Sequence, residues 1–148
     1  MRFLLVDRIH EVEPGTRIRG AKCAAMSEDY FEWHFPERPI VPGMLILEAC
    51  TQLAGWLEAA TSDFANWAVL EEVKSARYYD FALPGDVIEL ELTCTERGEE
   101  RSTYLAETRV GEKRGAALEF VARTVALDTL EDPARMQRQF DTLRRETT

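Results

Sequence analysis

The sequence predicts an α+β fold in which an antiparallel sheet wraps around one long central helix. Three observations lead to this prediction. Residues 42–61 form an almost wholly apolar helical pattern, residues 88–95 alternate between apolar and polar side chains, and turn sequences separate several further strand-like segments. A helix with little polar face needs other structure to bury it, and the strand-like segments on either side can supply that structure.

The length of the chain limits how many such units it contains. At 148 residues it can bury one core of ordinary size but not two. We therefore expect a single domain over residues 1–128, followed by a polar tail or short helix over residues 129–148. The sequence contains no internal repeat and no low-complexity segment.

Two elements are expected in the first half of the chain, a β-hairpin and then the central helix. Ile9–Val12 and Thr16–Cys23 contain β-branched residues and flank Pro14-Gly15, a dipeptide that is typical of turns. The helix is expected over residues 42–61, and the Ser-Asp pair that follows is expected to end it. Its many leucines and alanines predict a central, buried position.

The second half is expected to supply the remaining strands. Trp67–Tyr79 is predicted to be a strand despite its charged residues, and the Pro-Gly-Asp sequence at 84–86 predicts a turn. The alternation over residues 88–95 is typical of a strand with one buried face. A second hairpin with a charged loop is expected at the end of the sheet, from Tyr104–Val110, the loop 111–115 and Ala116–Leu127.

The last eighteen residues, Glu131–Thr148, are almost entirely polar. Met136, Phe140 and Leu143 nevertheless recur there at helical spacing. This pattern predicts either a short amphipathic helix or a frayed tail.

Composition and charge exclude several classes of function. A net charge of −9 disfavours non-specific nucleic-acid binding, which requires a basic surface. No apolar run reaches the length of a membrane span, and charge interrupts the apolar N-terminal residues too early for a secretory signal. A cytoplasmic protein without a membrane partner is therefore expected.

The three cysteines predict neither a disulfide framework nor a metal site. Cys23, Cys50 and Cys94 are odd in number and lie far apart, without the spacing of metal ligands. We expect reduced thiols, no metal and no cofactor.

The candidate chemistry lies in residues 34–49, HFPERPIVPGMLILEA. His34 can accept a proton near neutral pH, and Glu48 lies on an apolar helix, where burial disfavours the ionised form and favours proton donation. Gly43 begins the helix, so its backbone N–H can stabilise a negative oxygen. Gln52, one turn after Glu48, can orient that carboxylate or satisfy a backbone group. Together these groups suit removal of a proton beside a thioester and loss of a β-hydroxyl.

Purely structural roles are also open for these residues. A histidine between aromatic residues is more often packed and hydrogen-bonded than catalytic, and His10 suits such a role as well. Glu48 can equally be a buried carboxylate paired with an arginine of a neighbouring strand. The aromatic residues Trp56, Trp67, Tyr78, Tyr79 and Phe81 can line an acyl tunnel, but in a domain of this size aromatic residues usually form the core.

The central run resembles the motif of the 3-hydroxyacyl-(acyl carrier protein) dehydratases of the hot-dog fold. The similarity includes the opening Phe-Leu-Leu-Val-Asp-Arg-Ile at residues 3–9, Glu-Pro-Gly at 13–15, and Pro-Gly-Asp at 84–86 followed by Ile-Glu-Leu. It covers most of residues 3–127, and the combination of His-Phe-Pro, Pro-Gly and a helical glutamate at these spacings is specific.

The resemblance implies a role for each site residue. His34 would remove the α proton, Glu48 would protonate the departing hydroxyl, and the Gly43 amide would bind the thioester carbonyl. Gln52, Trp33 and Phe35 are expected to bind substrate. The family pairs the histidine of one subunit with the carboxylate of another, which implies a homodimer or a trimer of dimers. A glutamate at position 48 is similar to the plain dehydratase branch, whereas the dehydratase/isomerase branch usually has aspartate there.

The sequence also departs from the family pattern. Trp33 replaces a glycine that usually precedes the histidine, and residues 77–81 replace a basic stretch that would meet an acidic carrier protein. The chain lacks the short helical segment that commonly precedes the Phe-Leu-Leu-Val-Asp-Arg run.

The expected function is dehydration of 3-hydroxyacyl thioesters to trans-2-enoyl thioesters in fatty-acid or polyketide-like biosynthesis. The acyl group is expected on an acyl carrier protein or on coenzyme A. Two alternatives are a hot-dog acyl thioesterase and a non-catalytic subunit that binds acyl thioesters.

Overall fold

The computed structural model describes residues 3–145 and contains one six-stranded antiparallel sheet, two α-helices and two short 3₁₀ helices. The predicted domain and tail reach at their ends into residues 1–2 and 146–148, which lie outside the described residues. The elements in chain order are β1 (Arg8–Glu13), β2 (Arg17–Cys23), η1 (Asp29–Glu32), α1 (Gly43–Thr61), β3 (Asn66–Tyr78), β4 (Val87–Arg97), β5 (Arg101–Val110), β6 (Lys113–Ala126), η2 (Leu127–Thr129) and α2 (Pro133–Arg144).

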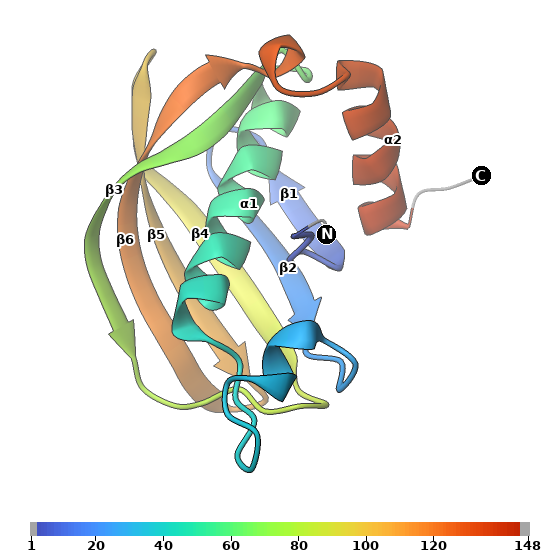
Figure 1. Cartoon of the computed structure of the whole chain (residues 1–148). Coiled ribbons are helices and arrows are strands. Elements are labelled where there is room, and N and C mark those ends of the chain that lie inside the picture. The colour runs from blue at the N-terminus through green and yellow to red at the C-terminus, as the bar shows by residue number, and fades with distance from the viewer. Residues whose placement is uncertain (1–2, 146–148) are drawn as a thin grey trace.

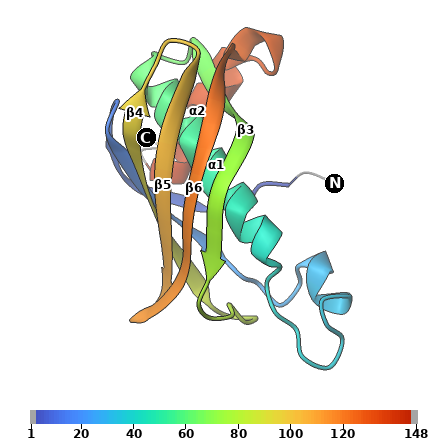
Figure 2. The same cartoon turned by 90° about the vertical axis from the view of Figure 1, so that its left-hand side faces the viewer.

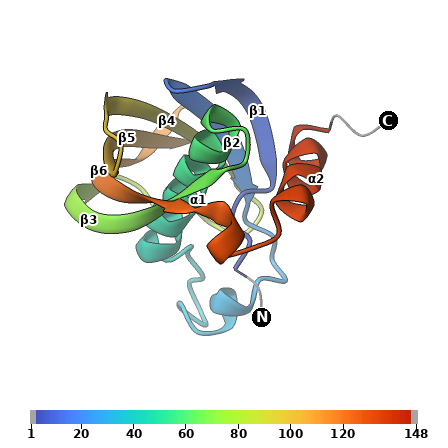
Figure 3. The ribbon, with the colours of Figure 1, turned by 90° about the horizontal axis from the view of Figure 1, so that it is seen from above.

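The sheet curves around α1, as Figures 1 and 3 show, so the predicted hot-dog arrangement is confirmed. Its strand order is β1-β2-β4-β5-β6-β3, which leaves β1 and β3 at the two edges. In Figure 2, β5, β6 and β3 stand in front of α1 and cover one side of it. The central helix therefore has its apolar surface enclosed on the concave side of the sheet.

The alternation in β4 explains how one face of the sheet meets the helix. Ile88, Leu90 and Leu92 are buried, while Glu89 and Glu91 are exposed. Because successive side chains of a strand point to opposite faces, this pattern places one apolar row against α1 and one acidic row in solvent. The same period of two recurs in the burial pattern of β5.

Both predicted hairpins are present, but the loop of the second is shorter than expected. The turn between β1 and β2 contains Gly15 with a φ of 76°, a left-handed conformation that glycine adopts without strain. In the second hairpin, Val110 pairs with Lys113 and Arg109 with Arg114, so the predicted loop 111–115 was wrong. Two of its charged residues, Lys113 and Arg114, belong to the exposed start of β6, where charge is compatible with a strand because solvent surrounds it.

The charged residues of β3 have a related explanation. From Leu70 to its end this edge strand is exposed, so Glu71, Glu72 and Lys74 remain in solvent. The predicted strand is therefore confirmed, and its weak apolar pattern reflects an edge position.

The polar C-terminal segment forms a helix that packs on the domain. Asp132 caps α2 by accepting a hydrogen bond from the Ala134 N–H, and Pro133 occupies the first turn. Phe140 is buried, with its ring centroid 5.8 Å from that of Trp56. Figure 3 shows α2 beside β1, outside the curve of the sheet. Within residues 3–145, neither helix has the length and apolarity needed to cross a membrane.

Candidate active site

The carboxylate of Glu48 is half-buried and lines a cavity of about 270 Å³ beside α1. One of its oxygens accepts a hydrogen bond from the Thr51 hydroxyl at 3.0 Å, and the other accepts one from the Gln52 side-chain amide at 3.0 Å. Both donors lie on the same helix, three and four residues later, where side chains naturally meet. The helix thus fixes the orientation of its own carboxylate.

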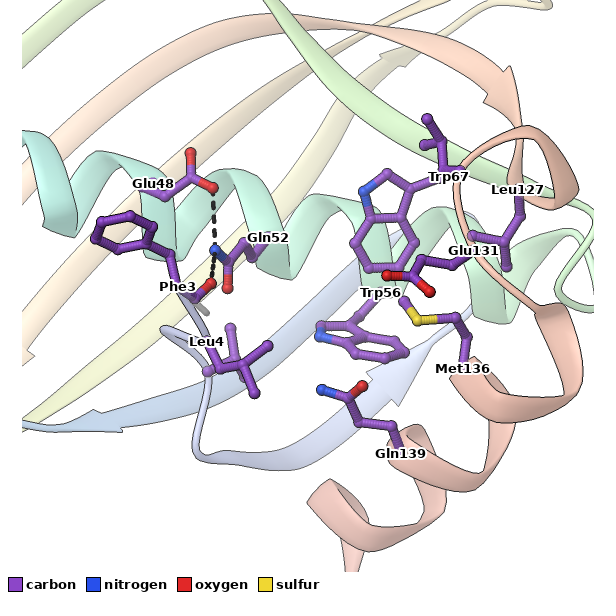
Figure 4. A pocket seen from close by; sticks show the side chains of 12 residues that line it. Phe3, Leu4, Glu48, Gln52, Trp56, Trp67, Leu127, Glu131, Met136 and Gln139 are labelled. Carbon is purple, nitrogen blue, oxygen red and sulfur yellow. Dashed lines mark hydrogen bonds between the residues drawn. The ribbon is translucent and has the colours of Figure 1, made fainter. Parts of the chain in front are cut away.

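Gln52 fulfils both of the roles that its sequence position left open. Besides holding Glu48, its amide donates to the Phe3 carbonyl at 2.7 Å and accepts from the Leu5 N–H at 2.9 Å. Figure 4 shows this chain of contacts from Glu48 through Gln52 to the N-terminal segment. Gln52 therefore connects the candidate acid to the N-terminal segment, whose Phe3 and Leu4 form one wall of the cavity.

Glu48 was considered as a buried carboxylate paired with an arginine of a neighbouring strand. In the structure Glu58 has this role. Glu58 is only 2% exposed, and its two oxygens lie 3.0 and 3.1 Å from two nitrogens of Arg97 on β4. This bidentate pair compensates the burial of the charge. By contrast, Glu48 is held by two neutral donors and faces the cavity, where its carboxyl group can reach a bound substrate.

His34 lies in the loop between η1 and α1 and is held at three points. Its N–H donates to the Tyr30 carbonyl, its carbonyl accepts from the Ile40 N–H, and its Nδ1 lies 3.1 Å from the Ile40 carbonyl oxygen. A proton on Nδ1 satisfies that carbonyl and leaves Nε2 as the acceptor. The ring also stacks on Phe35. His34 is thus packed and hydrogen-bonded, but its geometry also suits a base.

Gly43 begins α1, as predicted. A glycine is required at this position because Tyr78 packs against its backbone. The Tyr78 hydroxyl donates to the Gly43 carbonyl at 2.9 Å, and its ring lies 3.0 Å from where a Cβ would sit. Burial raises the pKa of Tyr78, which keeps the phenol protonated as a donor. The first N–H groups of a helix have no intrahelical acceptor, so they are available to an anionic oxygen.

The predicted site residues form two groups within one chain. Glu48 and Gln52 line the same cavity, whereas His34, Trp33 and Phe35 do not line it. The Trp33 side chain is 77% exposed, so within the chain it does not crowd this cavity.

Several cavity residues were not identified from sequence as parts of the site. Trp56 and Trp67 were expected to be core residues, yet both also line the Glu48 cavity (Figure 4). The spacing of Glu48, Gln52 and Trp56, four residues apart, indicated a shared helix face. Nothing in the sequence indicated that Met136 of α2 would contact the same space.

Comparisons with known proteins identify the family of the chain. A family model described as a FabA-like domain matches residues 1–119. A 3-hydroxyacyl-(acyl-carrier-protein) dehydratase FabZ of Caulobacter sp. is 34% identical over 126 residues, covering 83% of this chain and 77% of the relative. The FabZ of Lactiplantibacillus plantarum is 32% identical over 128 residues, covering 86% and 87%.

Among solved structures, smu.793 of Streptococcus mutans bound to acetyl CoA has a similar fold. Its TM-score is 0.64 at 15% identity, with 80% of this chain and 88% of that chain covered. At this identity the likeness supports the fold alone.

Proposed function

The chain belongs to the family of FabA-like domains, and from this premise we propose that it dehydrates 3-hydroxyacyl thioesters to trans-2-enoyl thioesters in fatty-acid biosynthesis. The observation that carries the proposal is the carboxylate of Glu48, oriented by Thr51 and Gln52 and facing a cavity beside an aromatic wall. The thioester carrier is acyl carrier protein or coenzyme A. The first of these carriers appears in the names of the relatives.

The reaction requires one base and one acid. Nε2 of His34 takes a proton from the α carbon, and the electron pair of that C–H bond forms the C=C bond as the C–O bond to the β-hydroxyl breaks. Glu48 donates a proton to the departing hydroxyl, which leaves as water. Return of the proton from His34 to Glu48 restores both groups, and the reverse sequence hydrates an enoyl thioester.

The negative charge that develops on the thioester oxygen needs a donor. The N–H of Gly43 supplies it, because it lies at the positive end of a nineteen-residue helix without an intrahelical acceptor. The Tyr78 ring and hydroxyl hold this turn in place.

The complete site requires two copies of the chain. His34 does not line the cavity that Glu48 faces, and the loop carrying it exposes Trp33, Phe35 and, at the start of α1, Met44. The edge strand β3 is also open for pairing. A homodimer would cover this apolar surface and place His34 of one subunit opposite Glu48 of the other. A trimer of dimers is compatible with the same contact.

The experiment that tests the proposal uses trans-2-enoyl thioesters of several lengths, with loss of conjugation and release of free thiol followed together. His34→Ala and Glu48→Gln should each lower the hydration rate by roughly 10²- to 10⁴-fold, the usual contribution of a general acid or base. His10→Ala is the matched control, because His10 lies on β1 and pairs with Glu89. Thiol release without hydration would indicate that the protein is a thioesterase and not a dehydratase. Full hydration activity in both site variants would refute the assignment.

A further inference from the structure

We propose that α2 forms the end wall of the acyl-binding cavity and thereby sets the longest acyl chain that the protein accepts. This inference rests on the proposed function, because it takes the acyl part of the thioester to be the occupant of the cavity. The C-terminal helix then has a role in substrate selection as well as in packing.

The cavity is continuous with the candidate acid. Glu48, Gln52 and Trp56 follow one another along a single face of α1 and all line it. Eight residues of helix span about 12 Å. A chain whose β carbon lies at Glu48 would therefore extend along this face toward Trp56 (Figure 4).

The walls of the cavity suit an apolar chain for most of this length. The two indole rings of Trp56 and Trp67 meet edge to face, with centroids 5.0 Å apart, and both line the cavity. Leu4 and Leu127 line it from the N-terminal segment and from η2. Aromatic and aliphatic walls with few polar groups are typical of ligand cavities.

The far end of the cavity differs from its walls. Met136 and Gln139 of α2 lie there, together with Glu131, which pairs with Arg135 at 3.0 Å. In Figure 4, Met136 lies beside the Trp56 ring on the side away from Glu48, Glu131 lies between the rings of Trp56 and Trp67, and Gln139 lies below the Trp56 ring. Further methylene groups would have to displace Met136 or desolvate an amide and a charged group, and both are unfavourable.

The wall is firmly attached to the core. Phe140 of α2 is buried between Trp56 and Phe64, with ring centroids 5.8 and 5.4 Å away. The Asp132 cap fixes the first turn of the helix, next to Met136. Since α2 lies beyond the 119 residues that the family model matches, this wall is supplied by a part of the chain outside the matched segment.

The dimensions give an expected length limit. A span of about 12 Å accommodates roughly eight to ten carbons of an extended chain, given C–C bonds of about 1.5 Å. The volume of about 270 Å³ is near the lower end of the range for small-molecule cavities, roughly 300–1,000 Å³. We therefore expect a medium-length acyl chain.

The test measures binding as well as turnover, so that it does not depend on the chemistry. Dissociation constants are measured by calorimetry for saturated acyl-coenzyme A thioesters of four to sixteen carbons, and kcat/KM for the matching enoyl thioesters. Affinity should rise by up to about fourfold per methylene and then level off near the expected limit. Met136→Ala should move the limit to longer chains, and Met136→Trp should move it to shorter ones.

Two glutamines of α2 provide a matched comparison. Gln139 lines the cavity, whereas Gln137, two residues earlier, is exposed and does not line it. Gln139→Leu should tighten binding of the longest accepted chains several-fold, and Gln137→Leu should change nothing. Melting temperatures identify any variant that fails to fold.

The outcomes separate this inference from the proposed function. A length limit that shifts with Met136 and Gln139 in the binding measurement supports the wall even if no thioester is hydrated. If all four variants hydrate enoyl thioesters with the chain-length profile of the wild type, α2 does not set the length limit. The dehydratase assignment would remain intact. Equal shifts from Gln137→Leu and Gln139→Leu would also overturn it.

Discussion

At the scale of single residues, two glutamates on one helix show how surroundings decide a role. Glu48 and Glu58 both lie on α1 among apolar neighbours, and the sequence pattern alone does not distinguish them. Glu58 meets Arg97 and forms a buried ion pair, whereas Glu48 meets two neutral donors and a cavity. The distinction arises from what each carboxylate faces, an arginine of β4 for Glu58 and a cavity for Glu48, and this depends on the fold.

Thr51 is expected to be a positioning residue for Glu48. Thr51→Val keeps the size and the helix propensity of the side chain but removes the hydroxyl that reaches the carboxylate. Loss of the hydrogen bond that orients the reacting group should raise the barrier of the chemical step by roughly 1.5–3 kcal/mol, so kcat should fall by roughly 10- to 100-fold while KM stays nearly constant. Steady-state kinetics with an enoyl thioester measure this separation.

Thr61→Val is the control for that prediction. Thr61 ends the same helix and accepts a hydrogen bond from the Gly15 N–H, far along α1 from Glu48. It should lower the melting temperature without changing kcat. If Thr61→Val slows catalysis as much as Thr51→Val does, the effect reflects helix stability, and the positioning role is wrong.

At the scale of elements, the contact between α1 and β3 depends on one glycine. A Cβ added at Gly55 would lie 2.1 Å from the Trp67 ring, so the indole lies directly on the helix backbone. This contact places Trp67 in the wall of the cavity. A glycine in the middle of a helix ordinarily costs about 1 kcal/mol relative to alanine, and here the packing of Trp67 offsets that cost.

Gly55→Ala should therefore destabilise the protein, although helix propensity alone predicts the opposite sign. Overpacking typically costs about 1–3 kcal/mol, and displacement of Trp67 should bring the net loss to about 2 kcal/mol. The coupling free energy between positions 55 and 67 is measured by urea unfolding. The proteins compared are the wild type, Gly55→Ala, Trp67→Leu and the double variant. In the double variant the added methyl should be nearly neutral or stabilising. Equal costs of Gly55→Ala in both backgrounds would contradict the contact.

Local patterns predicted most elements, because hairpins, turns and a buried helix depend on neighbouring residues. The turn at Gly15, the start of α1 at Gly43 and the alternation in β4 are examples. The contact of Trp67 with Gly55 and the packing of Phe140 on Trp56 involve distant segments, and no local pattern indicates them. The same reason explains the site: Glu48 and Gln52 were identified from helical spacing, whereas the contribution of α2 to the cavity was not.

At the scale of the whole molecule, the described chain has both catalytic candidates but does not bring them to one cavity. Glu48 lines the cavity beside α1, whereas His34 lies in the loop before α1 among exposed aromatic residues. The proposed two-fold assembly would solve this problem, because in a symmetric dimer each subunit would give its histidine to the other's cavity and receive one in return. Each dimer would then contain two equivalent sites.

Mixing two inactive variants tests this arrangement directly. A dimer of His34→Ala and Glu48→Gln chains would contain one site with both defects and one with neither, so co-expression should restore activity. With random pairing half of the dimers are hybrids, each with one intact site, which gives about a quarter of the wild-type hydration rate. Pairing His34→Ala with the double variant should restore none. If each chain instead formed its own site, every mixture would stay at the level of its parents, because no exchange of subunits could unite an intact histidine with an intact glutamate.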